Sequence, residues 1–214
     1  MKKTILLLVL LIGFKWAAFS QTVSIGSQVW MTKNLDVSTF RNGEKIPEAK
    51  TEEEWSKAGE EGRPVWCKYP FESTDKGEHG KLYNWYAVND PRGLAPKGWK
   101  IPSEMDWNQL IKFLGGESAA GNKIKSANGW FDGGEGTNES GFNGLPSGYR
   151  SDFGEGDIGA FYSGGEIGGW WSSSNLETND LGDAQYFQLY YSSNEAILLH
   201  CFKSDGFSVR CIKD

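Results

Sequence analysis

Cysteine and histidine are scarce in this chain, which limits the metal and nucleophile chemistry that it can carry. It contains three cysteines, Cys67, Cys201 and Cys211, and two histidines, His79 and His200. A structural zinc site needs four such ligands at close spacing, whereas these five are scattered. Neither histidine lies in a nucleophile motif, so a Ser-His-Asp triad has no signature here. The composition therefore argues against zinc binding and against triad hydrolases.

Positive charge and long apolar runs are also in short supply. Lysine and arginine number 22 against 28 aspartates and glutamates, for a net charge of −6. Nucleic acids and anionic membranes are bound by clustered lysine and arginine, which an acidic chain does not favour. After residue 14 no apolar stretch is long enough to cross a bilayer. We expect no nucleic-acid partner and no membrane span in the mature chain.

The one apolar run has the layout of a secretory signal peptide. Lys2 and Lys3 precede an almost unbroken apolar stretch from Ile5 to Phe14, and small residues before Gln21 offer a cleavage site. The run is too short for an ordinary membrane span, and a buried N-terminal helix is the alternative. We predict that residues 1–20 are removed and that residues 21–214 form one domain, secreted to the periplasm or the cell surface. The removed segment carries three lysines and no acid, so the net charge becomes −9.

Glycine and aromatic residues, in contrast, are abundant. The chain has 28 glycines, 10 tryptophans, 8 tyrosines and 12 phenylalanines. Low-complexity chains are also rich in glycine, but they lack so many large rings. From Asn128 to Gly169 glycine recurs every few residues with aromatics between, which predicts long ordered loops held by buried rings.

Capping signals and alternating patterns predict an α+β fold. Thr51 with Glu54 and Ser103 with Asp106 form capping boxes, which begin helices that run to about Ala58 and to the glycines after Leu114. These are the two principal helices that we expect on a short twisted antiparallel sheet. Alternation and turn residues predict an opening strand or hairpin at 23–31 and strands at 35–40, 168–174, 184–191, 196–202 and 207–212.

One acidic loop segment is a candidate calcium site. Asp132, Glu135, Asn138 and Glu139 supply oxygen donors at close spacing, and calcium takes six to eight oxygen ligands. The segment lacks the EF-hand pattern, and aspartate and asparagine also form turns without metal. Calcium is therefore a candidate cofactor.

Exposed rings beside acids and amides are the means by which lectin-like sites hold sugars. The candidates in the loop-rich region are Trp130, Phe131, Tyr149, Tyr162 and Trp170. The alternative for each ring is burial under a loop, which is the usual fate of large aromatics. The Glu-Pro-Asn motif of calcium-dependent lectins is absent.

An expected turn at Ser204–Gly206 separates two of the cysteines. In a two-residue hairpin Cys201 and Cys211 lie on opposite faces of the sheet. In a three-residue hairpin they are diagonal neighbours about 7–8 Å apart, which is long for a disulfide. A disulfide between Cys67 and Cys211 is therefore preferred, with Cys201 as the odd thiol.

An ordered set of motifs covers nearly the whole mature chain: IGSQVWM at 25–31, WCKY at 66–69, GKLYNWYAV at 80–88, GWKIPS at 98–103, TNESGF at 137–142, LPSGYR at 145–150, WWSSS at 170–174 and GFSVRC at 206–211. In this order and spacing they resemble one family, the Fibrobacter succinogenes major paralogous domain, which is common in secreted proteins of Bacteroidetes and Fibrobacteres. Ser147 departs from the family, which is expected to have glycine there. The WC and VRC motifs supply Cys67 and Cys211, and Cys201 is an addition of this chain.

The resemblance implies a C-type-lectin-like fold, in a group that also includes formylglycine-generating enzymes. It implies no defined activity, because this fold hosts many functions. Arg150 and Arg210 lie in the strongest motifs, and we expect them to brace loops against the sheet.

Three functions are compatible with these observations. The first is a binding or adhesion module that recognises a glycan or an extracellular protein through the 128–170 loops. The second is an oxidase or hydrolase, for which no catalytic constellation stands out. The third is a structural cell-surface component, whose sign would be an oligomer or fibre held by an exposed sheet edge.

Overall fold

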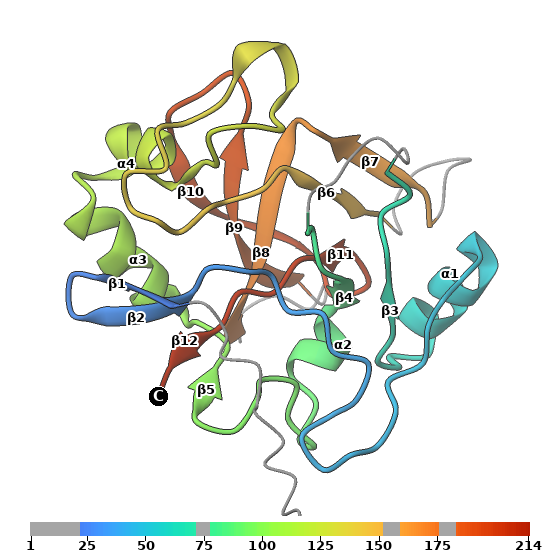
Figure 1. Ribbon diagram of the computed structural model, residues 1–214. Helices are drawn as coiled ribbons and strands as arrows, with labels where there is room; N and C mark the ends of the chain where they lie inside the picture. The colour runs from blue at the N-terminus through green and yellow to red at the C-terminus, as the bar shows by residue number, and fades with distance from the viewer. Residues whose placement is uncertain (1–21, 72–77, 152–158, 176–182) are drawn as a thin grey trace, which may run out of the picture.

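A computed structural model describes residues 22–71, 78–151, 159–175 and 183–214 (Figure 1). The predicted signal peptide, residues 1–20, lies outside the described residues. The structure is mixed, with much strand and few helices, which confirms the coarse α+β prediction. None of the described helices is long and apolar enough to cross a membrane.

Three sheets organise the described chain, and their paired strands are antiparallel. The first sheet has the order β1 (Thr22–Ile25), β2 (Gln28–Met31), β12 (Ile212–Lys213) and β5 (Trp99–Lys100). The second has the order β10 (Ala196–Phe202), β9 (Asp183–Tyr190) and β8 (Ile167–Asn175). The third has the order β3 (Trp66–Cys67), β4 (Leu82–Asn84), β11 (Gly206–Phe207), β6 (Ser147–Arg150) and β7 (Phe161–Gly164). In the first sheet Ile212 pairs with both Trp30 and Lys100, so β12, the last strand, lies between β2 and β5.

Both predicted helices are present and begin at their predicted caps. Helix α1 (Glu52–Glu60) has the capping box of Thr51, and α3 (Glu104–Phe113) has the capping box of Ser103. Local hydrogen bonds satisfy the first free N–H groups of each helix, which is why sequence alone located these starts.

The prediction of two principal helices is incomplete. Helix α2 (Trp85–Val88) follows β4 directly, and α4 (Glu117–Ile124) begins after the glycines that end α3. Gly121 of α4 has an amide that donates to the Asn194 carbonyl, and a Cβ there would lie 2.4 Å from that oxygen. Glycine inside α4 weakens its helical signal but permits this close approach.

Most predicted strands are present, and two predictions are wrong. Residues 35–40 form no strand, because the Leu35 amide donates to Val209 in the chain between two sheets. The predicted strand at 207–212 is split into β11 and β12, which belong to different sheets. Between them Ser208 bridges to Trp170, and the Cys211 carbonyl accepts from Met31. Residues 206–213 therefore pass from the third sheet to the first, and the strands that they pair with change along the way.

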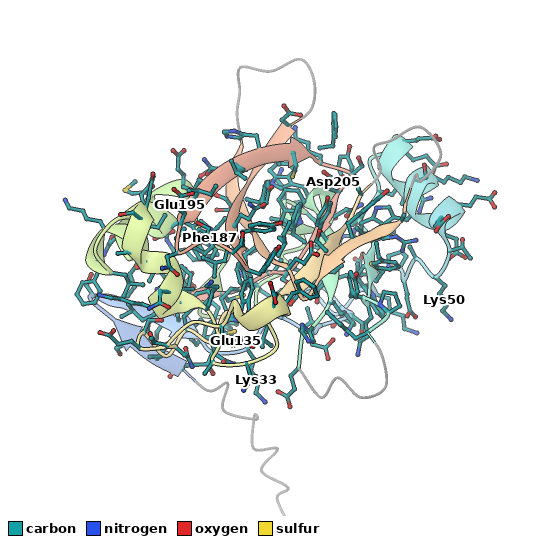
Figure 2. All side chains as sticks on the ribbon, turned by 90° about the horizontal axis from the view of Figure 1, so that it is seen from above. Lys33, Lys50, Glu135, Phe187, Glu195 and Asp205 are labelled. Atoms are coloured by element: carbon teal, nitrogen blue, oxygen red, sulfur yellow. The ribbon has the colours of Figure 1, made fainter. Side chains whose placement is uncertain are left out.

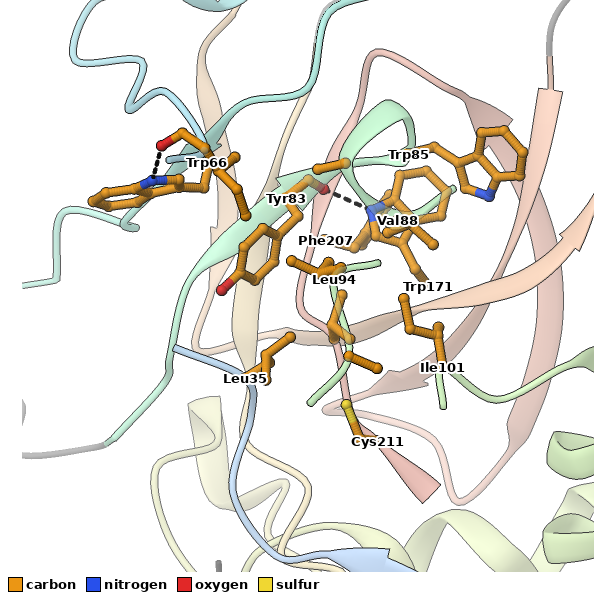
Figure 3. Packing of buried hydrophobic residues seen from close by; sticks show 14 of the residues in the cluster. Leu35, Trp66, Tyr83, Trp85, Val88, Leu94, Ile101, Trp171, Phe207 and Cys211 are labelled. Carbon is orange, nitrogen blue, oxygen red and sulfur yellow. Dashed lines mark hydrogen bonds between the residues drawn. The ribbon is translucent and has the colours of Figure 1, made fainter. Parts of the chain in front are cut away.

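Buried aromatic and aliphatic side chains form three clusters that join the sheets to the helices. In the cluster of Figure 3 the indole of Trp171 donates to the Tyr83 carbonyl at 2.6 Å, and the indole of Trp66 donates to Ile46 at 2.9 Å. A second cluster packs the rings of Trp107 and Phe187, which stack with centroids 4.5 Å apart. Phe187 is fully buried, whereas Lys50 and Glu195 are exposed; all three are labelled in Figure 2.

Two fully buried arginines hold the loops, as predicted. The guanidinium of Arg150 donates to the carbonyls of Gly159, Ala49 and Thr51. The guanidinium of Arg210 donates to the side-chain oxygen of Asn34 and to the backbone carbonyls of Met31 and Phe142. Buried charges need such full hydrogen bonding, so these arginines fix the loop positions around them.

Candidate functional site

Two of the five predicted sugar-binding rings are core side chains. Trp130 is 4% exposed, and its indole donates to the Ser126 hydroxyl at 3.0 Å. Trp170 is fully buried, and its indole donates to the Asn34 side-chain oxygen at 2.8 Å. Neither ring has a face on the surface, because each fills the space under a glycine-rich loop.

Tyr149 and Tyr162 face each other across the β6–β7 pair. Their rings stack with centroids 5.6 Å apart, and Tyr149 also stacks on Phe207 at 5.4 Å. Both tyrosines are partly buried. Burial, followed by the nearby Asp205, raises the pKa of Tyr149 above its ordinary value. The two tyrosines continue the stack of rings outward from Phe207. They lie on β6 and β7 of the third sheet, which contributes no residue to the pocket described next.

Phe131, the fifth candidate, is on the surface. Its side chain is 57% exposed, at the start of a short 3-10 helix (Phe131–Gly133). Its ring meets the edge of Tyr191, with centroids 5.5 Å apart, and Tyr191 in turn contacts the exposed Tyr190. The Phe131 amide donates to Gly165 at 2.7 Å, which anchors the turn. Three rings therefore gather on one part of the surface.

A polar pocket of about 300 Å³ opens beside these rings. It is lined by three segments: Lys125 just after α4, residues 132–135, and residues 191–194 between β9 and β10. Glycines allow the segments to meet, since a Cβ on Gly134 would lie 2.4 Å from the Tyr191 carbonyl oxygen. Asp132, which lines the pocket, has a left-handed backbone at φ 50°, which is uncommon outside glycine. We call this pocket, together with the adjacent ring of Phe131 that contacts Tyr191, the 131–135/191–194 pocket.

Lys125 holds the floor of this pocket. Lys125 is only 2% exposed. Its ammonium donates to the carbonyls of Ser193, Tyr191 and Tyr190 at 3.0, 3.2 and 3.5 Å. Burial lowers the pKa of Lys125, and the charge of Glu135 opposes that effect. An ammonium has three hydrogens, which match these three carbonyl acceptors in number. Asp132 and Glu135 are exposed and line the pocket.

The four calcium candidates do not converge on one point. Asp132 and Glu135 line the pocket, while the side-chain oxygen of Asn138 accepts the Asn143 amide at 2.8 Å and Glu139 is exposed. Within the described part of the chain, no three histidine, cysteine, aspartate or glutamate side chains are grouped to hold a metal ion. The carboxylates present thus do not form a calcium ligand set.

The predicted Cys67–Cys211 disulfide is wrong, because all three cysteines are free. Cys67 and Cys211 are buried in different core clusters. The hairpin assumed for Cys201 and Cys211 is also absent, since β11 pairs with β4 and β6 and not with β10. Burial raises the pKa of Cys67 to about 11 and that of Cys211 to about 12, and it raises the pKa of Cys201 as well. Thiols with raised pKa values are poor nucleophiles at neutral pH.

Half of the pocket was missed by sequence reasoning. Lys125 follows a helix that the sequence does not predict, and residues 192–194 fall in the break between the predicted strands 184–191 and 196–202. The polar Ser192-Ser193-Asn194 turn beside two tyrosines was the available signal. Nothing local indicated that this turn faces residues 131–135.

Comparison with known proteins adds one finding. The family model described as the Fibrobacter succinogenes major domain matches residues 23–213. No significant match to a curated protein or to a solved structure was found. The resemblance drawn from the motifs is thereby confirmed over almost the whole described chain.

Proposed function

The chain belongs to the Fibrobacter succinogenes major domain family, and on that premise we propose that it is a binding module that recognises a glycan through the 131–135/191–194 pocket. The observation that carries the proposal is Phe131, a large apolar ring that is 57% exposed beside a polar pocket. An exposed phenylalanine costs free energy in water, and a ligand that covers its face recovers that cost.

The pocket offers what a sugar ring requires. A sugar presents an apolar face of C–H groups and a rim of hydroxyls, which match an aromatic ring and hydrogen-bonding side chains respectively. Asp132 and Glu135 supply acceptors, and Ser192 and Asn194 supply both donors and acceptors. The volume of the pocket, about 300 Å³, suits one or two sugar units. A protein partner would need a wide contact area, about 800 Å² on each side, which a small pocket does not provide.

We extend the proposal to the fold and to the location of the protein. The pairing of the last strand with the first hairpin, and the long loops between β5 and β8, support a C-type-lectin-like architecture. The apolar run before Gln21 supports export by a signal peptide. An experimental structure superposed on C-type-lectin-like domains tests the first point. Fractionation of cells that carry the full chain, with sequencing of the mature N-terminus, tests the second.

Two exposed phenylalanines make a matched test of the site. A glycan array probed with the chain identifies a ligand, and calorimetry measures its affinity with and without calcium. Phe131→Ala is expected to weaken binding about tenfold, since a buried aromatic contact contributes about 1–2 kcal/mol. Phe113→Ala is the control, because Phe113 is 61% exposed on α3, which contributes no lining residue, whereas Phe131 precedes the lining residue Asp132 and its ring contacts Tyr191. Equal affinity of both variants for a glycan that the parent binds would refute this site.

A further inference from the structure

Strand β10 is an edge of the second sheet in the described part of the chain, and α4 and α3 contact it. It lies at the end of the order β10-β9-β8, and among the described strands it pairs with β9 alone. Its seven residues, AILLHCF, contain no proline and no lysine. Ile197, Leu198 and Leu199 are only partly buried. Proteins normally protect edge strands with charges, proline or bulges, so an apolar edge without them is suited to pairing with another strand.

The residues at the ends of this strand indicate which strand it fits. Glu195 immediately precedes β10 and is exposed, and Lys203 immediately follows it and is partly exposed. Both lie four positions from Leu199 at the centre of the strand. In an antiparallel pair of identical strands centred on Leu199, each Glu195 faces Lys203 of the other copy. Opposite charges that face each other across a strand pair are stabilising.

Other registers fit less well. Facing side chains must lie on the same side of the sheet, so the two-fold axis has to pass through a residue and not between two. Centring the pair on His200 places Glu195 opposite Asp205, which are like charges. Centring it on Leu198 places Glu195 opposite Cys201 and leaves Lys203 opposite Ser193. The register centred on Leu199 alone pairs the charges.

From this pattern we propose that the chain forms a two-fold symmetric dimer through antiparallel β10–β10 pairing, which joins two three-stranded sheets into one of six strands. Leu199 then faces its own copy at the axis, and Ile197 faces Cys201 of the other copy. Isologous contacts of this kind close on themselves and stop at two copies.

The dimer has a consequence for recognition, and this one point rests on the proposed function. Asn194 of the 131–135/191–194 pocket lies two residues before β10. Antiparallel pairing therefore places the two pockets toward opposite ends of the joined strands. Two linked sites bind a repeating glycan with higher avidity than one site, without any new contact.

Charge exchange tests the interface. Sedimentation velocity of the chain without its predicted signal peptide is expected to show a monomer–dimer equilibrium. Glu195→Lys and Lys203→Glu should each weaken the dimer about tenfold, because each variant changes two Glu195–Lys203 pairs from attraction to repulsion. The double variant should restore the parent affinity. Glu53→Lys on α1 makes the same charge change away from β10 and should have no effect.

Cross-linking tests the register independently of affinity. In a Cys201→Ser background, Leu199→Cys places two thiols directly opposite each other, where Cα atoms about 4.5–5.5 Å apart allow a disulfide. His200→Cys faces Leu198 instead and should cross-link poorly. A monomer at every concentration, a double variant as weak as the single ones, or cross-linking through residue 200 in preference to 199 would overturn the proposal. None of these outcomes bears on glycan binding by the single chain.

Discussion

The ammonium of Lys125 lies 3.0 Å from the carbonyl oxygen of Ser193, and it thereby connects the end of α4 to the turn between β9 and β10. A buried lysine is costly unless its hydrogens are all bonded, and this one reaches the carbonyls of Tyr190 at the end of β9 and of Tyr191 and Ser193 in that turn. The side chain acts as an internal cation that gives the pocket its shape.

Replacement of Lys125 is expected to loosen the pocket and the fold together. Lys125→Met should lower the free energy of unfolding by about 2–3 kcal/mol, because it leaves buried carbonyls without a donor. Glycan affinity should fall with it. Urea denaturation measures the stability. Lys123→Met is the control, since Lys123 on the same helix is partly exposed and its change should cost less than about 0.5 kcal/mol. Equal losses in the two variants would contradict this role.

Thiol counting checks the state of the cysteines. With all three free, the unfolded chain should react with three equivalents of a thiol reagent in the absence of reductant. In the folded chain Cys67 and Cys211 should react very slowly, since both are buried and their pKa values are raised. A single reactive thiol after unfolding would instead indicate a disulfide.

The same thiols should make stability fall at high pH. A thiol has an ordinary pKa of 9.0, whereas burial holds Cys67 at about 11. The folded chain keeps a proton that the unfolded chain releases, so this contribution is complete below pH 9 and is lost as the pH rises toward 11. The expected slope is about 1.4 kcal/mol per pH unit for each such thiol. Denaturation curves at pH 8–11 should show a slope smaller by that amount in Cys67→Ala, and identical slopes would refute the assignment.

Arg210 should be among the least replaceable residues. Its guanidinium is fully buried, bonds the Asn34 side chain and lies over the Phe142 ring at 4.3 Å. Burial lowers the pKa of Arg210 to about 9. Lysine keeps a charge but cannot reproduce the planar fork, so Arg210→Lys should cost about 3–5 kcal/mol by thermal or urea denaturation. Arg63→Lys is the control, because Arg63 forms an exposed pair with Glu61 and should cost less than about 0.5 kcal/mol. A small loss at Arg210 would show that water replaces its bonds.

Local chemistry accounts for what the sequence predicted correctly. Both capping boxes, the first hairpin and strands β8, β9 and β10 depend on neighbours within a few residues, so their signals are complete in a short window. Helix α4 was missed because Gly121 is explained only by the distant Asn194 carbonyl. The strand predicted at 207–212 failed for a similar reason, since its partners belong to different sheets.

The sequence by itself determined the family, the two capped helices and the demand for many buried rings. Only the tertiary structure decided which rings are buried: Trp130 is core and its neighbour Phe131 is exposed, although both lie in the same glycine-rich segment. It also decided that the cysteines are apart and that residues 191–194 complete the pocket. Burial and convergence depend on what comes from elsewhere in the chain, and no local pattern of residues contains that information.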